Sequence, residues 1–350
     1  MADFDLSIII PLYNAEYYIK DCLSTLVNQS IDPGRYEIIV IDDGSKDNSL
    51  QVAKDFAVKY PNVHIIEQEN QGVSAARNTG IDQARGAYIY FIDADDYLAH
   101  NTLNKVLNDV LERDLQVLYF EFISTNERNL FSSKNLDTYQ IDRRVYTGTD
   151  FIANYPSING VWRSIVKKDF ILRNNLHFIK GICILEDVIY LFELLSVAER
   201  VSSTNLDVHR YYQNPKSMVH NKEEAHYNKA IKDQKYAVIK INELIENIAS
   251  RNGNMDKCIE KLKGYQHYYI FTLLARHIKS SLTFNDFKDL VNDFKNLGMY
   301  PITHFPSKTK VHIFYKIAGY LFNRPFLLLP FAYTVKKLNL GKYLLHPQEK

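Results

Sequence analysis

The first third of the chain alternates between two hydrophobic periods. Short runs that are apolar almost throughout, typical of buried strands, are separated by stretches in which apolar residues recur every three or four positions, as in amphipathic helices. The predicted strands cover residues 6–12, 36–42, 63–68, 87–93 and 116–122. The predicted helices cover residues 15–29, 46–60, 73–85 and 101–114. This alternation predicts an α/β fold with a doubly wound, mostly parallel sheet.

The regular alternation ends near residue 125, which suggests four segments. Residues 1–125 form the α/β half, and residues 126–222 form a second half of the same domain, with mixed short elements and a helix expected within 181–200. Residues 223–300 have a helical pattern, clearest over 226–249, and form a helical C-terminal extension. Residues 301–350 form a basic, aromatic tail.

Composition indicates an ordinary soluble globular protein. Of the 350 residues, 46% are hydrophobic and 24% are charged. Three cysteines, Cys22, Cys183 and Cys258, are too few and too scattered for a disulfide framework or a zinc cluster. The N-terminus begins with "MADFDLSIII", which lacks the basic segment and cleavage site of a signal peptide. We therefore expect a cytoplasmic protein.

Charge is unevenly distributed along the chain. Residues 301–350 contain eight Lys or Arg and one acid, a formal charge of +7, which leaves 34 bases and 40 acids, or −6, in the first 300 residues. A nucleic-acid-binding protein would carry positive charge along its binding face, so this distribution argues against that class.

The basic tail interleaves its cations with aromatic and aliphatic residues. Its longest apolar run, residues 326–335, contains Pro330 and is too short to span a bilayer. The pattern favours a helix pair that lies on an anionic membrane surface, and so a peripheral contact at the inner face of the cell membrane. A basic helical hairpin packed on the body is the alternative.

Carboxylates follow two of the predicted strands. The run "AYIYFIDADDY" ends in Asp93, Asp95 and Asp96, and "YEIIVIDDGS" ends in Asp42 and Asp43. Each cluster alone could be a solvated turn that caps a helix. Together they are expected at one edge of the sheet, because the carboxyl ends of parallel strands meet there. Such oxygen ligands suit Mg²⁺ or Mn²⁺ held jointly with substrate phosphates, which implies a nucleotide diphosphate.

The glycine motifs of other nucleotide-binding proteins are absent from the sequence. The first strand is followed by "YNAE" where a dinucleotide-binding protein would have G-x-G-x-x-G, and no G-x-x-x-x-G-K-[ST] occurs. A phospho-accepting receiver domain would place its Asp residues after the first and third strands. These three classes are therefore disfavoured.

Four ordered motifs resemble the N-terminal domain of family 2 inverting glycosyltransferases, which have the GT-A fold and use nucleotide-diphosphate sugars. The motifs are "SIIIPLYNAEYYI", "IIVIDDGSKDNS", "NQGVSAARNTGI" and "AYIYFIDADDYL", spread over about 100 residues. The resemblance implies that residues 1–125 bind the nucleotide sugar and residues 126–222 form the acceptor side.

The resemblance also implies roles for particular donor-side residues. Asp43 would accept a hydrogen bond from the uracil or other base, and Arg77 would lie beside the nucleotide. Asp95 and Asp96 would bind the metal, Mn²⁺ or Mg²⁺, near the sugar diphosphate. The full set of implied nucleotide-sugar-binding residues is Pro11, Tyr13, Asn14, Asp42, Asp43, Arg77, Asp93 and Asp95. The structural alternatives are a strand end for Pro11, core packing for Tyr13 and a solvated or salt-bridged side chain for Arg77.

The catalytic base is expected in "GICILEDVIY". Asp187, beside Glu186, resembles the family's E-D motif, although an acidic pair that opens a helix also fits the helix dipole alone. Trp162 is either a platform for the acceptor sugar or a core residue. His209 and Arg210 are further candidates, because their segment resembles one that folds over the donor in relatives.

The sequence thus predicts an inverting hexosyltransferase that moves a sugar from a UDP-sugar to a glycan hydroxyl. A lipid-linked precursor of a bacterial surface polysaccharide is the expected acceptor. A sugar nucleotidyltransferase and a catalytically inactive nucleotide-sugar-binding protein are the alternatives. The sugar, the acceptor and the linkage stay open.

Overall fold

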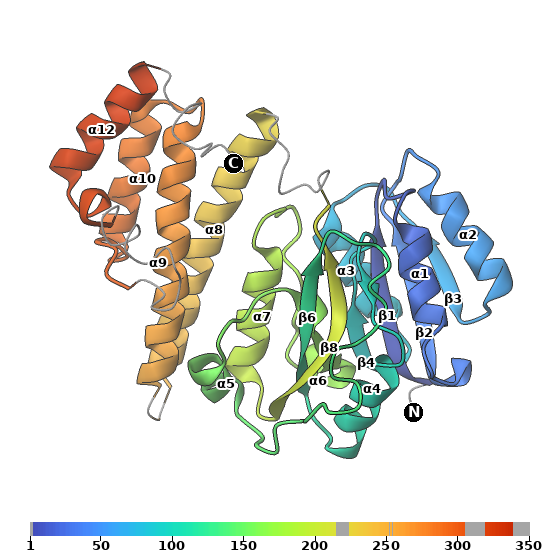
Figure 1. Cartoon of the computed structure of the whole chain (residues 1–350). Helices are drawn as coiled ribbons and strands as arrows, with labels where there is room; N and C mark the ends of the chain where they lie inside the picture. The colour runs from blue at the N-terminus through green and yellow to red at the C-terminus, as the bar shows by residue number, and fades with distance from the viewer. Residues whose placement is uncertain (1–2, 215–223, 252, 254, 305–318, 339–350) are drawn as a thin grey trace. The chain divides into compact units, whose positions relative to one another are not determined.

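The chain divides into two compact units, residues 1–217 and 218–350. The computed structural model describes residues 3–214, 224–251, 253, 255–304 and 319–338 (Figure 1). The first unit holds an α/β sheet and the second is helical. The boundary expected at residue 222 lies outside the described residues.

The described part of the first unit is built on an eight-stranded sheet with the order β3-β2-β1-β4-β7-β6-β8-β5. The pairs β3-β2, β2-β1, β1-β4 and β6-β8 are parallel, whereas β7 and β5 run antiparallel to their neighbours. The strands are β1 (Phe4–Leu12), β2 (Tyr36–Asp42), β3 (Val63–Glu67), β4 (Gly86–Phe91), β5 (Tyr97–Leu98), β6 (Val117–Thr125), β7 (Ser164–Lys167) and β8 (Val201–Tyr212). The predicted α/β class with a mostly parallel sheet is confirmed.

Helices cover both faces of this sheet (Figure 1). Ile8 and Ile10 of β1 belong to one buried cluster with residues of α1, α2 and α4, as the two-residue period of a strand requires. Ile9 points to the other face, where α3 approaches so closely that a Cβ on Gly80 would lie 2.3 Å from Ile9 Cγ2. The helices of this unit are α1 (Ile19–Val27), α2 (Ser49–Lys59), α3 (Val73–Gln83), α4 (Leu103–Glu112), α5 (Gly148–Asn154), α6 (Lys168–Arg173) and α7 (Glu186–Val197), with short 3₁₀ turns η1 (Pro33–Arg35) and η2 (Val161–Arg163).

Two strands that decide the site, β7 and β8, did not stand out in the hydrophobic pattern. β7 contributes only four residues, too few for a clear two-residue period. β8 alternates polar residues that are buried, including Ser202, Thr204 and His209, with apolar ones, so its pattern suggests a half-exposed segment. Both strands are fixed by their neighbours, since β7 lies between β4 and β6, and β8 lies between β6 and β5.

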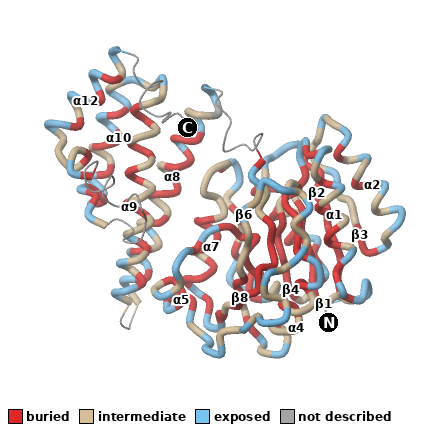
Figure 2. Tube along the Cα trace, in the orientation of Figure 1, coloured by how far each residue is buried: buried red, intermediate tan, exposed pale blue. Residues whose placement is uncertain are grey.

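The described part of the second unit contains α8 (Glu224–Ala249), α9 (Asp256–Lys279), α10 (Phe284–Asn296) and α12 (Pro325–Lys337). They enclose a separate apolar core, visible as the buried stripes in Figure 2. Lys336 of α12 caps the end of α9, because its Nζ donates to the carbonyls of His277 and Ser280 at 2.8 and 3.1 Å. Within the described residues, no helix combines the length and the apolar character needed to cross a bilayer.

Candidate active site

The structure places both carboxylate clusters at one edge of the sheet. Asp42 ends β2 and Asp93 follows β4, and the two strands flank β1. Adjacent strands are about 4.8 Å apart, so the two clusters are separated by about 10 Å. That span suits a nucleotide whose base and diphosphate contact different strands.

Asp43 organises the loop that leads into α3. Its carboxylate accepts hydrogen bonds from Gln68 Nε2 at 2.7 Å and from the backbone N–H groups of Gln71 and Gly72 at 2.9 and 2.8 Å. A carboxylate has about four lone-pair sites, so one acceptor position is left for a base. In Asp42, Oδ2 accepts from the Ser45 N–H at 3.2 Å, whereas the buried Oδ1 has no hydrogen-bond partner among the described residues.

The predicted base-pocket residues of the first strand lie beside this loop. Pro11 belongs to β1 and pairs in register with Ile41 of β2. Tyr13 is 46% exposed, which excludes the core alternative and leaves its ring free to stack on a planar base. Asn14 has a left-handed backbone, with φ of 49°, and its Oδ1 accepts from the Lys46 N–H at 2.7 Å. The loops after β1 and β2 are thereby tied together.

Asp96 ends a buried chain of hydrogen bonds. His209 Nε2 lies 2.8 Å from Asp96 Oδ2, and His209 Nδ1 lies 2.8 Å from the Tyr90 hydroxyl. Burial lowers the pKa of His209 to about 3, so the ring is neutral and has one donor nitrogen. The arrangement that satisfies every group has Tyr90 donating to Nδ1 and Nε2–H donating to Asp96. The other oxygen of Asp96 accepts from the Tyr212 N–H at 2.8 Å.

Asp95 lies next to this chain. Its Oδ2 accepts from Asn214 Nδ2 at 2.9 Å, and Asn214 Oδ1 in turn accepts from the Tyr18 hydroxyl at 3.1 Å. Burial, with the charges of Asp96 and Asp93 beside it, raises the pKa of Asp95 to about 7. A cation at this position would relieve that repulsion and keep the carboxylate ionised.

Arg77 joins the two halves of the site. Its side chain is only 4% exposed, and its NH2 donates to Asp93 at 2.9 Å while its NH1 donates to Glu186 at 3.0 Å. The guanidinium also lies over the ring of Phe178, at 5.3 Å from the centroid. The solvated alternative for Arg77 is therefore excluded, whereas the salt-bridged alternative agrees with the structure. Of its two bonded carboxylates, Asp93 follows β4 and Glu186 opens α7, 93 residues later in the sequence.

Glu186 and Asp187 open α7, as the E-D motif predicted. The residue before them, Leu185, adopts a left-handed conformation with φ of 65°, which an aliphatic side chain rarely does. Burial, together with the charge of Glu186, raises the pKa of Asp187 to about 7, and Arg77 opposes this rise. A carboxylate with this pKa can accept a proton near neutral pH.

Trp162 is 8% exposed and packs inside the site. Its indole stacks on His209 at 4.4 Å and on Tyr211 at 5.3 Å between ring centroids. This position supports the core alternative, in which Trp162 holds the histidine that positions Asp96. Arg210 has a structural role, since its guanidinium pairs with Asp207 at 2.9 Å and donates to the carbonyl of Leu130.

Sequence analysis missed Tyr211 and Asn214 as site residues. Burial raises the pKa of Tyr211, and the charges of Asp96 and Asp95 add to this rise. Asn214 bonds Asp95 directly. Both belong to "HRYYQN", the segment that was already noted for His209. The motif could therefore have identified them as site residues, whereas their residue types alone could not.

The carboxylates suit a divalent cation that is shared with a substrate. Oxygen donors are the ligands that Mg²⁺ and Mn²⁺ prefer. The described residues contain no group of three or more His, Cys, Asp or Glu side chains placed to hold a metal ion by themselves. Asp95 and Asp96 would therefore contribute part of a coordination shell that diphosphate oxygens complete.

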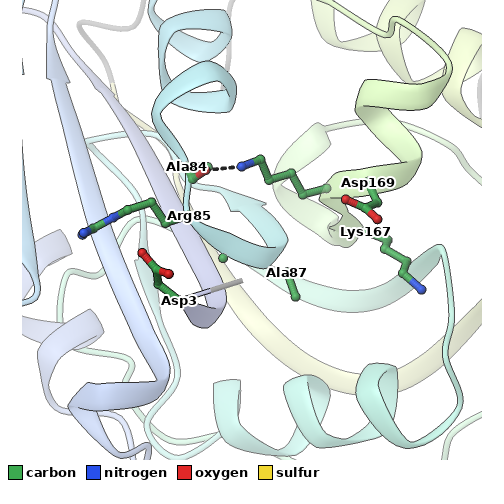
Figure 3. Close-up of a pocket in the computed structure, with 8 residues that line it drawn as sticks. Asp3, Ala84, Arg85, Ala87, Lys167 and Asp169 are labelled. Carbon is green, nitrogen blue, oxygen red and sulfur yellow. Dashed lines mark hydrogen bonds between the residues drawn. The ribbon is translucent and has the colours of Figure 1, made fainter. Parts of the chain in front are cut away.

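A surface cavity lies at the opposite edge of the sheet, lined by residues that include Asp3, Arg85, Lys167 and Asp169 (Figure 3). Two of its cations are already in ion pairs, Arg85 NH2 with Glu37 at 2.8 Å and Lys167 with Asp114 at 2.5 Å, and the third, Lys168, donates to the carbonyl of Ala84. It starts at the amino ends of β1 and β4, away from the carboxylates. We therefore do not assign the donor site to it.

The sheet, with carboxylates at the carboxyl ends of its strands, has a GT-A-type fold. Residues 7–170 match the model of glycosyl transferase family 2, so the chain carries a family 2 glycosyltransferase domain. It is 35% identical over 216 residues to "Uncharacterized glycosyltransferase YibD" of Escherichia coli, which covers 59% of this chain and 61% of the relative. It is 36% identical over 146 residues to the poly(ribitol-phosphate) beta-glucosyltransferase of Bacillus spizizenii, covering 40% of this chain and 23% of the relative. The chain thus matches less than two thirds of the length of these relatives.

Solved structures share the fold at low sequence identity. S. aureus TarS 1–349 in complex with UDP-GlcNAc superposes with a TM-score of 0.61 at 18% identity, covering 98% of this chain and 93% of that one. The mannosyltransferase PcManGT from Pyrobaculum calidifontis, in complex with GDP-Man and Mn²⁺, gives 0.57 at 15% identity, covering 96% and 87%. A GT-A structural neighbour therefore binds Mn²⁺.

Proposed function

We propose that the protein is an inverting glycosyltransferase that moves one sugar from a UDP-sugar to a hydroxyl of a glycan acceptor. Asp187 is the general base, and Asp95 and Asp96 are the metal ligands. The nucleotide is bound by the loops that follow β1 and β2. The family 2 match and the carboxylate edge support this assignment.

One observation carries the proposal: Arg77 bridges Asp93 and Glu186. The bridge ties the carboxylates that follow β4 to the residue next to Asp187. An inverting displacement needs a base on the side of the anomeric carbon opposite the leaving diphosphate, at a fixed distance from the donor site. A buried bidentate guanidinium between two elements supplies such fixed spacing.

In this mechanism the acceptor hydroxyl donates its proton to Asp187 as its oxygen attacks the anomeric carbon. The bond between that carbon and the diphosphate oxygen breaks with its electron pair, and UDP leaves. One displacement inverts the configuration at the anomeric carbon. A pKa of about 7 lets Asp187 be ionised at neutral pH and still accept a proton. Mn²⁺ or Mg²⁺, when bound, would neutralise the charge that develops on the diphosphate.

Uracil is proposed as the donor base because TarS, which shares the fold, was solved with UDP-GlcNAc. The guanosine donor of PcManGT is the competing possibility. Asp43, which has one acceptor position left, is the residue proposed to contact the base, and Tyr13 would stack on either base. A donor panel scored by nucleotide release decides between the two bases.

The acceptor is proposed to be a lipid-linked surface-polymer precursor at the inner face of the cell membrane. The relative named for poly(ribitol-phosphate) supports a polymer acceptor. The basic tail, with a formal charge of +7 over residues 301–350, supports a peripheral membrane contact. We propose a cytoplasmic location for the protein.

The decisive experiment incubates the protein with each UDP-sugar, Mn²⁺ or Mg²⁺ and a polyprenyl-linked glycan, and measures UDP release and the anomeric configuration of the product. Transfer with inversion is expected. Retention at the anomeric carbon would refute the single displacement. Formation of a nucleotide sugar from a sugar phosphate would support the nucleotidyltransferase alternative, and binding of UDP without turnover would indicate an inactive binding protein.

A further inference from the structure

The helix α12 is apolar on both of its sides. Leu328, Ala332 and Val335 point into the core of the helical unit and are at most 3% exposed. On the other side lies a face formed by exposed residues, which we call the α12 face. Its members are Phe326, Leu327, Phe331, Tyr333 and Leu338.

This face is unusual for a surface helix. A helix at the surface of a globular unit normally has one apolar stripe and one polar face. Here the exposed residues include Phe326, at 70%, and Leu338, at 60%. Contiguous exposed apolar side chains of this size mark a contact surface for a partner or a membrane.

Cations flank the α12 face at both ends, each beside an aromatic ring. The guanidinium of Arg324 lies 3.5 Å from the ring centroid of Tyr320, and Lys337 Nζ lies 5.6 Å from that of Tyr333. Residues 319–338 contain no Asp or Glu. Aromatic rings paired with basic side chains around an apolar helix face are the arrangement found at the headgroup level of anionic membranes.

Length determines how such a helix would lie in the membrane. The 13 residues of α12 span about 20 Å at about 1.5 Å per residue, which is less than the roughly 30 Å of the hydrocarbon core. The inner side of the helix is also occupied by the protein core. The helix can therefore lie in the plane of the interface with its outer face among the lipids, but it cannot span.

We propose that the α12 face is a docking surface for anionic lipid bilayers. The apolar side chains enter the headgroup and acyl boundary while Arg324 and Lys337 contact lipid phosphates. The inference deepens the peripheral membrane contact of the proposed function, by assigning it to particular residues. It predicts binding that depends on both anionic lipid and ionic strength, because screening weakens the contribution of the cations.

The test is flotation of the full chain with vesicles of phosphatidylcholine, with and without phosphatidylglycerol. Wild type is expected to float only with the anionic vesicles. Phe326→Ser/Leu327→Ser should lower the partition coefficient by more than about tenfold. Arg324→Gln/Lys337→Gln should lower it by about 30-fold, at about fivefold per charge. Tyr236→Ser/Leu297→Ser is the matched control, because it removes an exposed aromatic and an exposed aliphatic residue from the same unit, and it should float like wild type.

Three results would overturn the proposal. Wild type could fail to float with anionic vesicles, or the control pair could lose as much flotation as the α12 pair. The α12 pair could instead convert a dimer to a monomer in light scattering while flotation is unchanged, which would make the face an interface between copies. Thermal unfolding of each variant, and UDP release with a water-soluble acceptor, should match wild type. The outcome for lipid binding is therefore separate from the outcome for sugar transfer.

A tryptophan placed on the face gives an independent measurement. Phe326→Trp should show the emission of a solvent-exposed indole in buffer and shift to the blue on anionic vesicles, above the constant background of Trp162. Blue emission in buffer that vesicles do not change would mean that the protein itself covers the face, and would overturn the proposal.

Discussion

Removal of the Arg77 guanidinium should destabilise the first unit and displace the pH dependence of transfer. Arg77→Met keeps an unbranched aliphatic side chain but removes the guanidinium that lies over Phe178, and it leaves the carboxylates of Asp93 and Glu186 without their shared cation. Breaking a buried ion pair by removing one partner costs about 3–5 kcal/mol. Asp93 is 34% exposed and can be rehydrated, so the expected loss is near the lower limit, about 3 kcal/mol.

This magnitude gives a measurable change in thermal stability. For a unit of 217 residues, each kcal/mol lowers Tm by about 2–4 °C, so Arg77→Met should melt about 6–12 °C lower. Glu186→Gln alone should lower the free energy of unfolding by about 1 kcal/mol, because Arg77 still forms its salt bridge with Asp93. The double variant should cost about 2 kcal/mol, less than the sum of the single losses, because no charge is left without a partner at position 186.

Arg173→Met is the control for this cycle. Arg173 also pairs with a carboxylate, Asp169, at 2.9 Å, but the two side chains are 73% and 67% exposed. Arg173→Met should change the free energy of unfolding by no more than about 0.5 kcal/mol. If Arg77→Met costs no more than Arg173→Met in calorimetric unfolding, or if the losses in the cycle simply add, the bridge does not link the two halves as we infer.

The same variant changes the pH profile of transfer. Arg77 opposes the rise in the pKa of Asp187, so without it that pKa should lie above about 7. The base must be ionised to accept a proton, and the acidic limb of the UDP-release profile should therefore move to higher pH. An unchanged limb in a variant that folds would contradict the assignment of Asp187.

Four further outcomes are expected. Asp187→Asn should reduce transfer by about 10²–10⁴ and leave UDP affinity nearly unchanged in calorimetry; retention of more than about a tenth of the activity would move the base elsewhere, first to Glu186. Because the pKa of Asp187 rises from 3.8 to about 7 on folding, its neutral form stabilises the protein fully below pH 3.8 and this stability is lost as the pH rises through about 7. Relative to wild type, Asp187→Asn should therefore gain stability as the pH rises from 3.8 to about 7. If the denaturant midpoints of the variant and of wild type change in parallel over this pH range, the reasoning is refuted. Asp96→Asn should weaken both UDP binding and turnover. In the wild-type protein EDTA should lower the affinity for UDP. Equal affinity with and without EDTA would refute the proposal that a metal ion takes part in UDP binding. His209→Phe removes the hydrogen bond to Asp96 but keeps an aromatic ring that can stack on Trp162. It should therefore clearly reduce metal-dependent UDP affinity while changing Tm little. If Trp162→Leu reduces UDP affinity and His209→Phe has no effect, the histidine has only a structural role.

The carboxylates at the sheet edge could be predicted from sequence because their signal is local. A buried run followed directly by Asp93, or by Asp42 and Asp43, specifies both a strand and what stands at its carboxyl end. Parallel strands then bring these ends together without further information. The same holds for Glu186 and Asp187, which precede a clearly apolar helix.

The roles of Arg77 and Trp162 could not be predicted in this way. Both are residue types with common structural uses, and their partners are distant in the sequence: Arg77 bonds Glu186, 109 residues away, and Trp162 stacks on His209. The partner of Arg77 depends on how α3 packs against the start of α7, and that of Trp162 depends on how β7 and β8 enter the sheet. Those strands were the ones that the periodicity did not reveal.

For this protein, then, the sequence by itself determined the α/β class, the edge of the sheet where the carboxylates gather and the residue types presented there, because each follows from the period and end of a single element. The tertiary structure alone decided how those residues are supported. The His209–Asp96 contact requires β5, β6 and β8 to lie side by side, and the Arg77 bridge requires α3 to pack against the start of α7. Burial at these contacts raises the pKa values of Asp95 and Asp187 to about 7, and burial is a property of the packed chain and not of any one segment.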